Sequence, residues 1–176
     1  FTIFSPVYAA GAILTLYLDG NVYDAVTVVK AGSSANAGFI GADLYVDTLI
    51  VRNENTGNVT NANLDTANNG DSDITAIYVD AGASTLTTQS GKDIYVWTGD
   101  TYTPGGSVIA EGDIYISSSS TMNAAANSVS VGSNFYNNGT WTHTGTLTFD
   151  IDSNNNNEFD PGSSTIGSDI VLQHSG

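Results

Sequence analysis

The chain has 176 residues, which is enough for one domain with a substantial core or for two small domains. Three Lys and Arg against 18 Asp and Glu give a formal net charge of -15, which argues against binding to nucleic acids and to anionic membranes. There is no cysteine, so disulfides, thiolate metal sites and cysteine nucleophiles are excluded. Only 12% of the residues are charged and 40% are hydrophobic, with Asn, Ser, Thr and Gly supplying the polar surface, which is typical of a folded all-β protein.

Residues 1–83 are predicted to form an irregular β region or cap with long inserts. The apolar opening FTIFSPVYAA fits either the end of a signal peptide or a first strand that adds to a neighbouring copy. The triplet Asp19-Gly20-Asn21 is a hairpin signal, and the polar segment 54–73 is predicted to be a surface loop. No sustained helical period and no stretch of about twenty apolar residues is present, so we expect neither helices nor a membrane span.

A short phrase, Leu or Ile followed by Tyr and another aliphatic residue, recurs along the chain. From Tyr95 onward its spacing is regular, at 20 residues to Tyr115 and 21 to Tyr136, where the phrase is weaker. Because successive side chains of a strand point to opposite faces, the aliphatic residues should face a core and the tyrosines should form an outward ladder. The predicted ladder consists of Tyr17, Tyr45, Tyr78, Tyr95, Tyr115 and Tyr136.

Two further sets of residues recur at the same period. One consists of triplets with an apolar centre at 85–87, 107–109, 128–130 and 146–148, and the other of Tyr102, Met122 and Trp141. Three short strands in each turn of about twenty residues predict a parallel β-solenoid over residues 84–176, with like residues stacked in register. The alternative fold is a jelly-roll β-sandwich that exchanges its N-terminal strand between copies.

The run from Gly112 to Asp150, GDIYISSSSTMNAAANSVSVGSNFYNNGTWTHTGTLTFD, resembles the repeats of very large secreted or cell-surface β-helical proteins of bacteria, including filamentous-haemagglutinin-like adhesins. The turns of those proteins read similarly, as Asn-Phe-x-Asn-Asn-Gly-Thr followed by an alternating Thr-rich strand. The similarity covers residues 84–150 and is one of composition and period. It implies an extracellular structural or adhesive role.

The segment 150–164, DIDSNNNNEFDPGSS, interrupts the period and is predicted to be an insert that binds calcium. Its alternating oxygen donors suit a cation that takes about six to eight oxygen ligands. It resembles the D-x-N-x-N-G-x-x-D-x-G-E calcium loops of secreted bacterial surface proteins, with Asn157 in place of the turn Gly and Ser163 in place of the bidentate Glu. The resemblance implies that Glu158 offers its backbone carbonyl; the alternative is a flexible Asn-rich loop. The predicted ligand residues are Asp150, Asp152, Asn154, Asn156, Glu158 and Asp160.

A catalytic role is not expected. The sequence shows no pair of acidic residues on a predicted strand and no Gly-x-Ser-x-Gly nucleophile pattern, and its basic side chains are few. His143 lies in an alternating Thr-rich stretch and is predicted to be a stacked surface residue, while His174 lies near the end of the sequence.

These observations favour an extracellular, calcium-stiffened structural protein that associates with copies of itself as a subunit or segment of a cell-surface fibre. Association is expected end to end or by N-terminal strand addition. The alternative function is a carbohydrate-binding adhesin module that stacks surface glycans on the tyrosine ladder. Mutual packing of the tyrosines is the simpler interpretation of that ladder.

Overall fold

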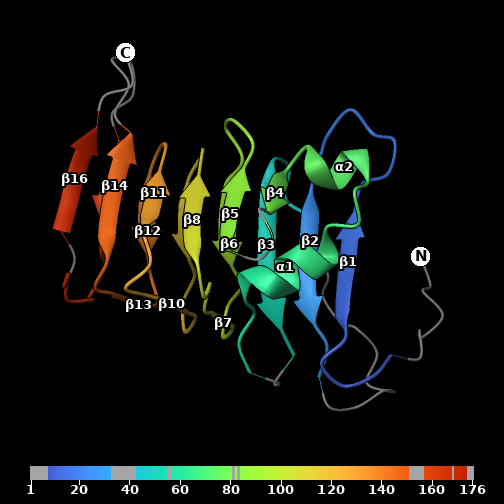
Figure 1. Cartoon of the computed structure of the whole chain (residues 1–176), viewed down its shortest axis with the longest axis horizontal. Coiled ribbons are helices and arrows are strands. Elements are labelled where there is room, and N and C mark those ends of the chain that lie inside the picture. The colour runs from blue at the N-terminus through green and yellow to red at the C-terminus, as the bar shows by residue number, and fades with distance from the viewer. Residues whose placement is uncertain are drawn as a thin grey trace.

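The computed structural model describes residues 8–32, 43–54, 57–80, 82, 84–150, 157–167 and 169–173. Their strands form three sheets, and within each sheet the strands follow one another along one long axis (Figure 1). Sheet A has the strand order β1 (Ile13–Tyr17), β2 (Val26–Lys30), β3 (Thr48–Asn53), β6 (Asp93–Val96), β9 (Ile114–Ile116), β12 (Phe135–Asn137) and β15 (Phe159–Asp160). Sheet B has the order β13 (Thr140–His143), β10 (Thr121–Ala125) and β7 (Thr101–Tyr102). Sheet C has the order β16 (Asp169–Gln173), β14 (Thr146–Asp150), β11 (Val129–Val131), β8 (Ser107–Ala110), β5 (Thr85–Thr88) and β4 (Tyr78–Asp80).

From β6 to β14 the chain visits sheets A, B and C in a fixed order, and each strand except β7, where sheet B begins, pairs in parallel with its counterpart one turn earlier. The protein is therefore a parallel β-solenoid, as the sequence predicts. The jelly-roll alternative is wrong, because its strands would pair antiparallel. The predicted register is also confirmed. The residues that stack are Ile94, Ile114 and Phe135 in sheet A, Tyr102, Met122 and Trp141 in sheet B, and Leu86, Val108, Val129 and Leu147 in sheet C.

Side chains alternate along each coil strand between the core and the outer surface. In β9, Ile114 and Ile116 are fully buried, whereas Tyr115 between them is partly exposed. The same alternation holds in β8, β11 and β12. Because successive turns are in register, the inward aliphatic and aromatic side chains stack into one continuous hydrophobic core.

Three of the tyrosine phrases do not occupy the position predicted for them. Tyr45 lies in the connection before β3, and the residue that pairs with Tyr95 from β3 is Ile50. Tyr78 lies in β4, which pairs antiparallel with β5, and is fully buried. Tyr17, in the antiparallel strand β1, packs against the core. A local phrase favours a strand but does not decide which sheet that strand joins, and this is why the ladder predictions for Tyr17 and Tyr78 are wrong, whereas the Tyr45 ring still reaches Tyr95 from its connection.

The polar segment 54–73, predicted as a surface loop, instead contains helix α1 (Asn61–Ala67) and the start of α2 (Ser72–Thr75). Thr60 and Asn63 form a capping box at the start of α1, each side chain accepting the backbone N–H of the other residue. Leu64 is fully buried. The sequence pattern does not reveal α1, because a helix of 7 residues is too short to show a hydrophobic period.

The two ends of the coil differ (Figure 1). Sheet A continues through β2 and β1 beyond β4, the last strand of sheet C, and there α1 packs against β1, β2, β4 and β5. At the opposite end β16 is the edge strand of sheet C, and all of its residues are exposed. No helix in the described part of the chain has the length and apolar character needed to cross a membrane.

Candidate functional site

The outer face of sheet A carries a column of tyrosine rings, one from each of three successive turns. Tyr95, Tyr115 and Tyr136 occupy equivalent positions in β6, β9 and β12. The ring centroids of Tyr95 and Tyr115 are 6.2 Å apart, and those of Tyr115 and Tyr136 are 5.0 Å apart with the planes 18° from parallel. The parallel register thus brings together three of the six tyrosines that the sequence predicts to form a ladder.

Two further rings extend this column toward β3. Tyr45 meets Tyr95 edge-on at 5.5 Å, and Trp97 lies 6.0 Å from Tyr95 and 6.2 Å from Tyr45. The guanidinium of Arg52 lies 5.5 Å from the centre of the Trp97 ring, within the range of a cation–π contact. Sequence reasoning missed Trp97, although its position two residues after Tyr95 places it on the same face.

Tyr17 and Tyr78 do not belong to this column, contrary to the sequence prediction. The hydroxyl of Tyr17 donates to Asp71 Oδ2 at 3.2 Å, and that of Tyr78 donates to the Leu64 carbonyl at 2.9 Å. The part of the chain that contains α1 and α2 is called the helical segment below. Both tyrosines hold it against the coil, because each bond joins a strand to α1 or to the residue that caps α2.

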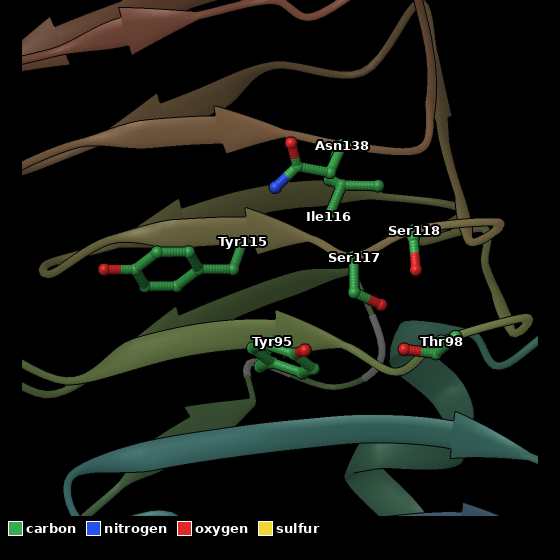
Figure 2. A pocket seen from close by; sticks show the side chains of 7 residues that line it. All are labelled: Tyr95, Thr98, Tyr115, Ile116, Ser117, Ser118 and Asn138. Carbon is green, nitrogen blue, oxygen red and sulfur yellow. The ribbon is translucent and has the colours of Figure 1, made fainter.

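A hollow of about 520 Å³ opens beside the tyrosine column. Its lining residues are Tyr95, Thr98, Tyr115, Ile116, Ser117, Ser118 and Asn138. Figure 2 shows the two rings at one end and the hydroxyls of Thr98, Ser117 and Ser118 at the other, where the strands run into turns. The Ser117 hydroxyl donates to the Val96 carbonyl at 2.7 Å. The side chains of Thr98 and Ser118 make no hydrogen bond within the described part of the chain, and both residues are exposed.

A second column, of carboxylates and an amide, runs along the start of the strands that carry the tyrosines. Asp93 Oδ1 accepts the backbone N–H of Asp113 at 2.7 Å, and Asp113 Oδ1 accepts that of Asn134 at 2.8 Å. Asn134 Oδ1 in turn accepts the N–H of Glu158 at 2.8 Å. Each side chain thus satisfies a backbone donor one turn further along, which fixes the register of the tyrosines. The sequence carried a signal for this column, since Asp or Asn stands two residues before each of these tyrosines.

The electrostatics of this face are acidic. The Tyr115 hydroxyl donates to Asp113 Oδ2 at 2.6 Å, and burial followed by this hydrogen bond raises the pKa of Tyr115. Burial also raises the pKa of Asp93 to about 6, with Asp113 and Asp47 adding repulsion. The ammonium of Lys92 is engaged by Asp47, so it does not neutralise the outer face.

The described residues of the predicted calcium loop lie at its two ends. Asp150 ends β14, and its carbonyl accepts the Asn157 side-chain N–H at 3.1 Å. The Glu158 carbonyl accepts the Phe135 N–H at 2.9 Å inside sheet A, and Asp160 Oδ1 accepts the Gly162 N–H at 2.9 Å.

The predicted ligands Asp152, Asn154 and Asn156 lie outside the described residues. Within the described ranges, no three His, Asp or Glu side chains are grouped to hold a metal ion.

His143 is buried, and its prediction as a surface residue is wrong. It shares the inward face of β13 with Trp141, whose ring centroid lies 4.9 Å away. Its Nε2 lies 2.7 Å from the Asn127 carbonyl, which orients the imidazole inside the coil. His174 lies outside the described residues.

Comparison with known proteins returned no matching family model, curated protein or solved structure. The function of this chain is therefore inferred from its own geometry. Two surfaces stand out in the described residues. One is the hollow beside the tyrosine column, and the other is the exposed edge formed by β16.

Proposed function

We propose that the protein is an extracellular structural β-solenoid that assembles with copies of itself as a subunit or segment of a cell-surface fibre. The observation that carries the proposal is the exposure of inward-facing apolar side chains in β16. Ile170 and Leu172 pair with Leu147 and Phe149, which face the core and are buried. Ile170 and Leu172 therefore stand at inward positions, yet they are 44% and 68% exposed.

These side chains border an apolar hollow at the end of the coil. Together with Phe149, Asn157 and Phe159 they line a space of about 230 Å³. An edge strand with unpaired backbone groups and inward-facing apolar side chains favours the addition of another strand. A second copy of the chain would bury this surface by pairing its own β16 with that of the first, since a twofold contact uses the same surface on both copies.

The β1 end supplies a different contact. There the helical segment closes the core, and Thr15 donates its hydroxyl to the Ala67 carbonyl at 3.2 Å. The backbone of β1 nevertheless remains the edge of sheet A. A fibre needs a second interface besides the one at β16, and strand addition to β1 would supply it.

Calcium and an extracellular location are part of this proposal. Like charges on two copies of a chain with a net charge of -15 repel each other, so a divalent cation would favour both the closed 150–164 loop and the contact between copies. The calcium proposal depends chiefly on Asp152, Asn154 and Asn156, since the Glu158 carbonyl is used within sheet A. The extracellular location is supported by the resemblance of residues 84–150 to adhesin repeats.

The test is negative-stain electron microscopy and sedimentation of the purified chain, with calcium and again with a chelator. We expect fibres of uniform width with calcium and fewer of them with chelator. The double variant Ile170→Lys/Leu172→Lys should not assemble. Val22→Lys is the matched control, because Val22 is an exposed apolar residue in the connection between β1 and β2. Particles of a single monomeric size for the unaltered chain under both conditions would overturn the proposal.

A further inference from the structure

The hollow beside Tyr95 and Tyr115 combines an aromatic surface with a polar surface, and one class of ligand requires both. Its aromatic end offers ring surface from β6 and β9, and its other end offers hydroxyl and amide groups. Thr98, Ser118 and Asn138 are exposed, and their side chains are not engaged in hydrogen bonds among the described residues. Their donors and acceptors are thus available to a ligand, whereas Ser117 is held by the Val96 carbonyl.

We propose that this hollow binds a neutral saccharide. A pyranose ring has an apolar face of C–H groups and a rim of hydroxyls. The C–H face would stack on the Tyr115 ring, and the rim would hydrogen-bond to Thr98, Ser118 and Asn138. A purely apolar ligand would leave those three polar groups without partners, which costs binding free energy.

The register of the coil sets the direction of the ligand. Tyr95 and Tyr115 stand on neighbouring turns with their ring centroids 6.2 Å apart. Neighbouring parallel strands lie about 4.8 Å apart, and adjacent sugar rings of an extended β-1,4-linked chain are separated by a similar distance. Such a chain can therefore run along the coil axis and place one sugar over each tyrosine.

The charge of the surrounding surface decides between neutral and acidic saccharides. Asp93 and Asp113 stand two residues before the two tyrosines, and Asp113 accepts the Tyr115 hydroxyl. No Lys or Arg lines the hollow, and Lys92 is engaged by Asp47 and Asp24. Uronic and sialic acids would be repelled here. The proposal therefore goes beyond the fibre role, and neither proposal depends on the other.

Binding can be measured by isothermal titration of the chain with cellotetraose, tetra-N-acetylchitotetraose and tetragalacturonate. The assembly-deficient variant Ile170→Lys/Leu172→Lys is titrated in parallel, so that failure of the fibre proposal leaves this result intact. We expect at least one neutral tetrasaccharide to bind and tetragalacturonate not to bind. Absence of binding by both neutral probes, or preferential binding of tetragalacturonate, would overturn the proposal.

Matched variants separate stacking from packing. Tyr115→Thr should weaken binding roughly tenfold, whereas Tyr115→Phe, which keeps the ring, should stay within about threefold of the unaltered chain. Tyr136→Thr is the control, because Tyr136 stacks in the same column but does not line the hollow. Thr98→Val/Ser118→Ala tests the polar end without touching the column and should also weaken binding. Equal effects of Tyr115→Thr and Tyr136→Thr, or no effect of the polar pair, would overturn the assignment.

Discussion

Asp93 Oδ1 accepts the backbone N–H of Asp113, one turn further along the coil, at 2.7 Å. The two residues begin the repeated phrases DIYV and DIYI, so the phrase encodes more than inward aliphatic side chains and an outward tyrosine. The side chain of its first residue also accepts a backbone hydrogen bond from the next turn. Asn134 takes the same place in the following turn, and its backbone N–H donates the equivalent bond to Asp113 Oδ1.

This column predicts a contrast between two substitutions of Asp113. Asp113→Ala should lower the free energy of unfolding by about 2 kcal/mol, because it leaves the Asn134 N–H without its partner in a half-buried position. Asp113→Asn keeps one side-chain oxygen and should cost less than about 1 kcal/mol. Urea unfolding followed by circular dichroism measures both. Equal losses for the two variants would contradict the role given to the acceptor oxygen.

The pKa of Asp93 predicts that stability depends on pH. Burial raises this pKa from 3.8 to about 6 in the folded protein, so the folded state holds the proton more tightly than the unfolded chain does. The free energy of unfolding should therefore fall as the pH rises from about 4 to about 6 and stay lower above that. Asp100, whose pKa burial also raises to about 6, acts in the same direction.

Asp93→Asn removes the ionisation and retains the acceptor oxygen. It should stabilise the protein at pH 7.5 by about 1 kcal/mol, a value reduced for the solvent exposure of a half-buried group. The variant should also show a shallower decline of stability between pH 4 and 6 when unfolding is measured across that range. A decline as steep as that of the unaltered chain would contradict the prediction.

The helical segment is held to the coil by a buried polar network. Tyr102 donates its hydroxyl to Asn61 Oδ1 at 2.6 Å, and Asn61 Nδ2 donates to the Ser107 carbonyl at 3.0 Å. Both Asn61 and Tyr102 are fully buried. Asn61→Leu should lower the free energy of unfolding by about 3 kcal/mol. The double variant Asn61→Leu/Tyr102→Phe should lose less than the sum of the losses in the two single variants. Thermal unfolding of the four proteins in this cycle gives the coupling, and simple additivity would show that the two groups act independently.

Calcium should stabilise the folded chain if the 150–164 loop binds it. A hundredfold excess of calcium over its Kd should raise the Tm by roughly 5–10 °C. The double variant Asp152→Asn/Asp160→Asn should lose most of this increase, as measured by differential scanning fluorimetry with calcium and with chelator. Asp65→Asn is the control, because Asp65 is an exposed carboxylate on α1, outside the loop. An unchanged Tm for the unaltered chain on addition of calcium would contradict the prediction.

The sequence by itself determined the coil and its register from residue 84 onward. The 20- and 21-residue spacing of Tyr95, Tyr115 and Tyr136 and the matching set Tyr102, Met122 and Trp141 gave the strand partners correctly. This was possible because stacked turns place equivalent residues in equivalent environments, so that similar residues recur in the sequence at the period of the coil.

Only the tertiary structure decided what happens where that repeat fails. Tyr78 has the same neighbours in sequence as Tyr95, but its strand pairs antiparallel with β5, and its ring is buried with the hydroxyl bonded to the Leu64 carbonyl of α1. Leu172 lies in an ordinary apolar strand, and its exposure follows from its place at the last described rung of sheet C. The hollow beside Tyr115 joins residues from three turns and their connections. Local sequence sets the conformation and the face of each side chain, whereas burial and binding depend on which distant segments lie next to it.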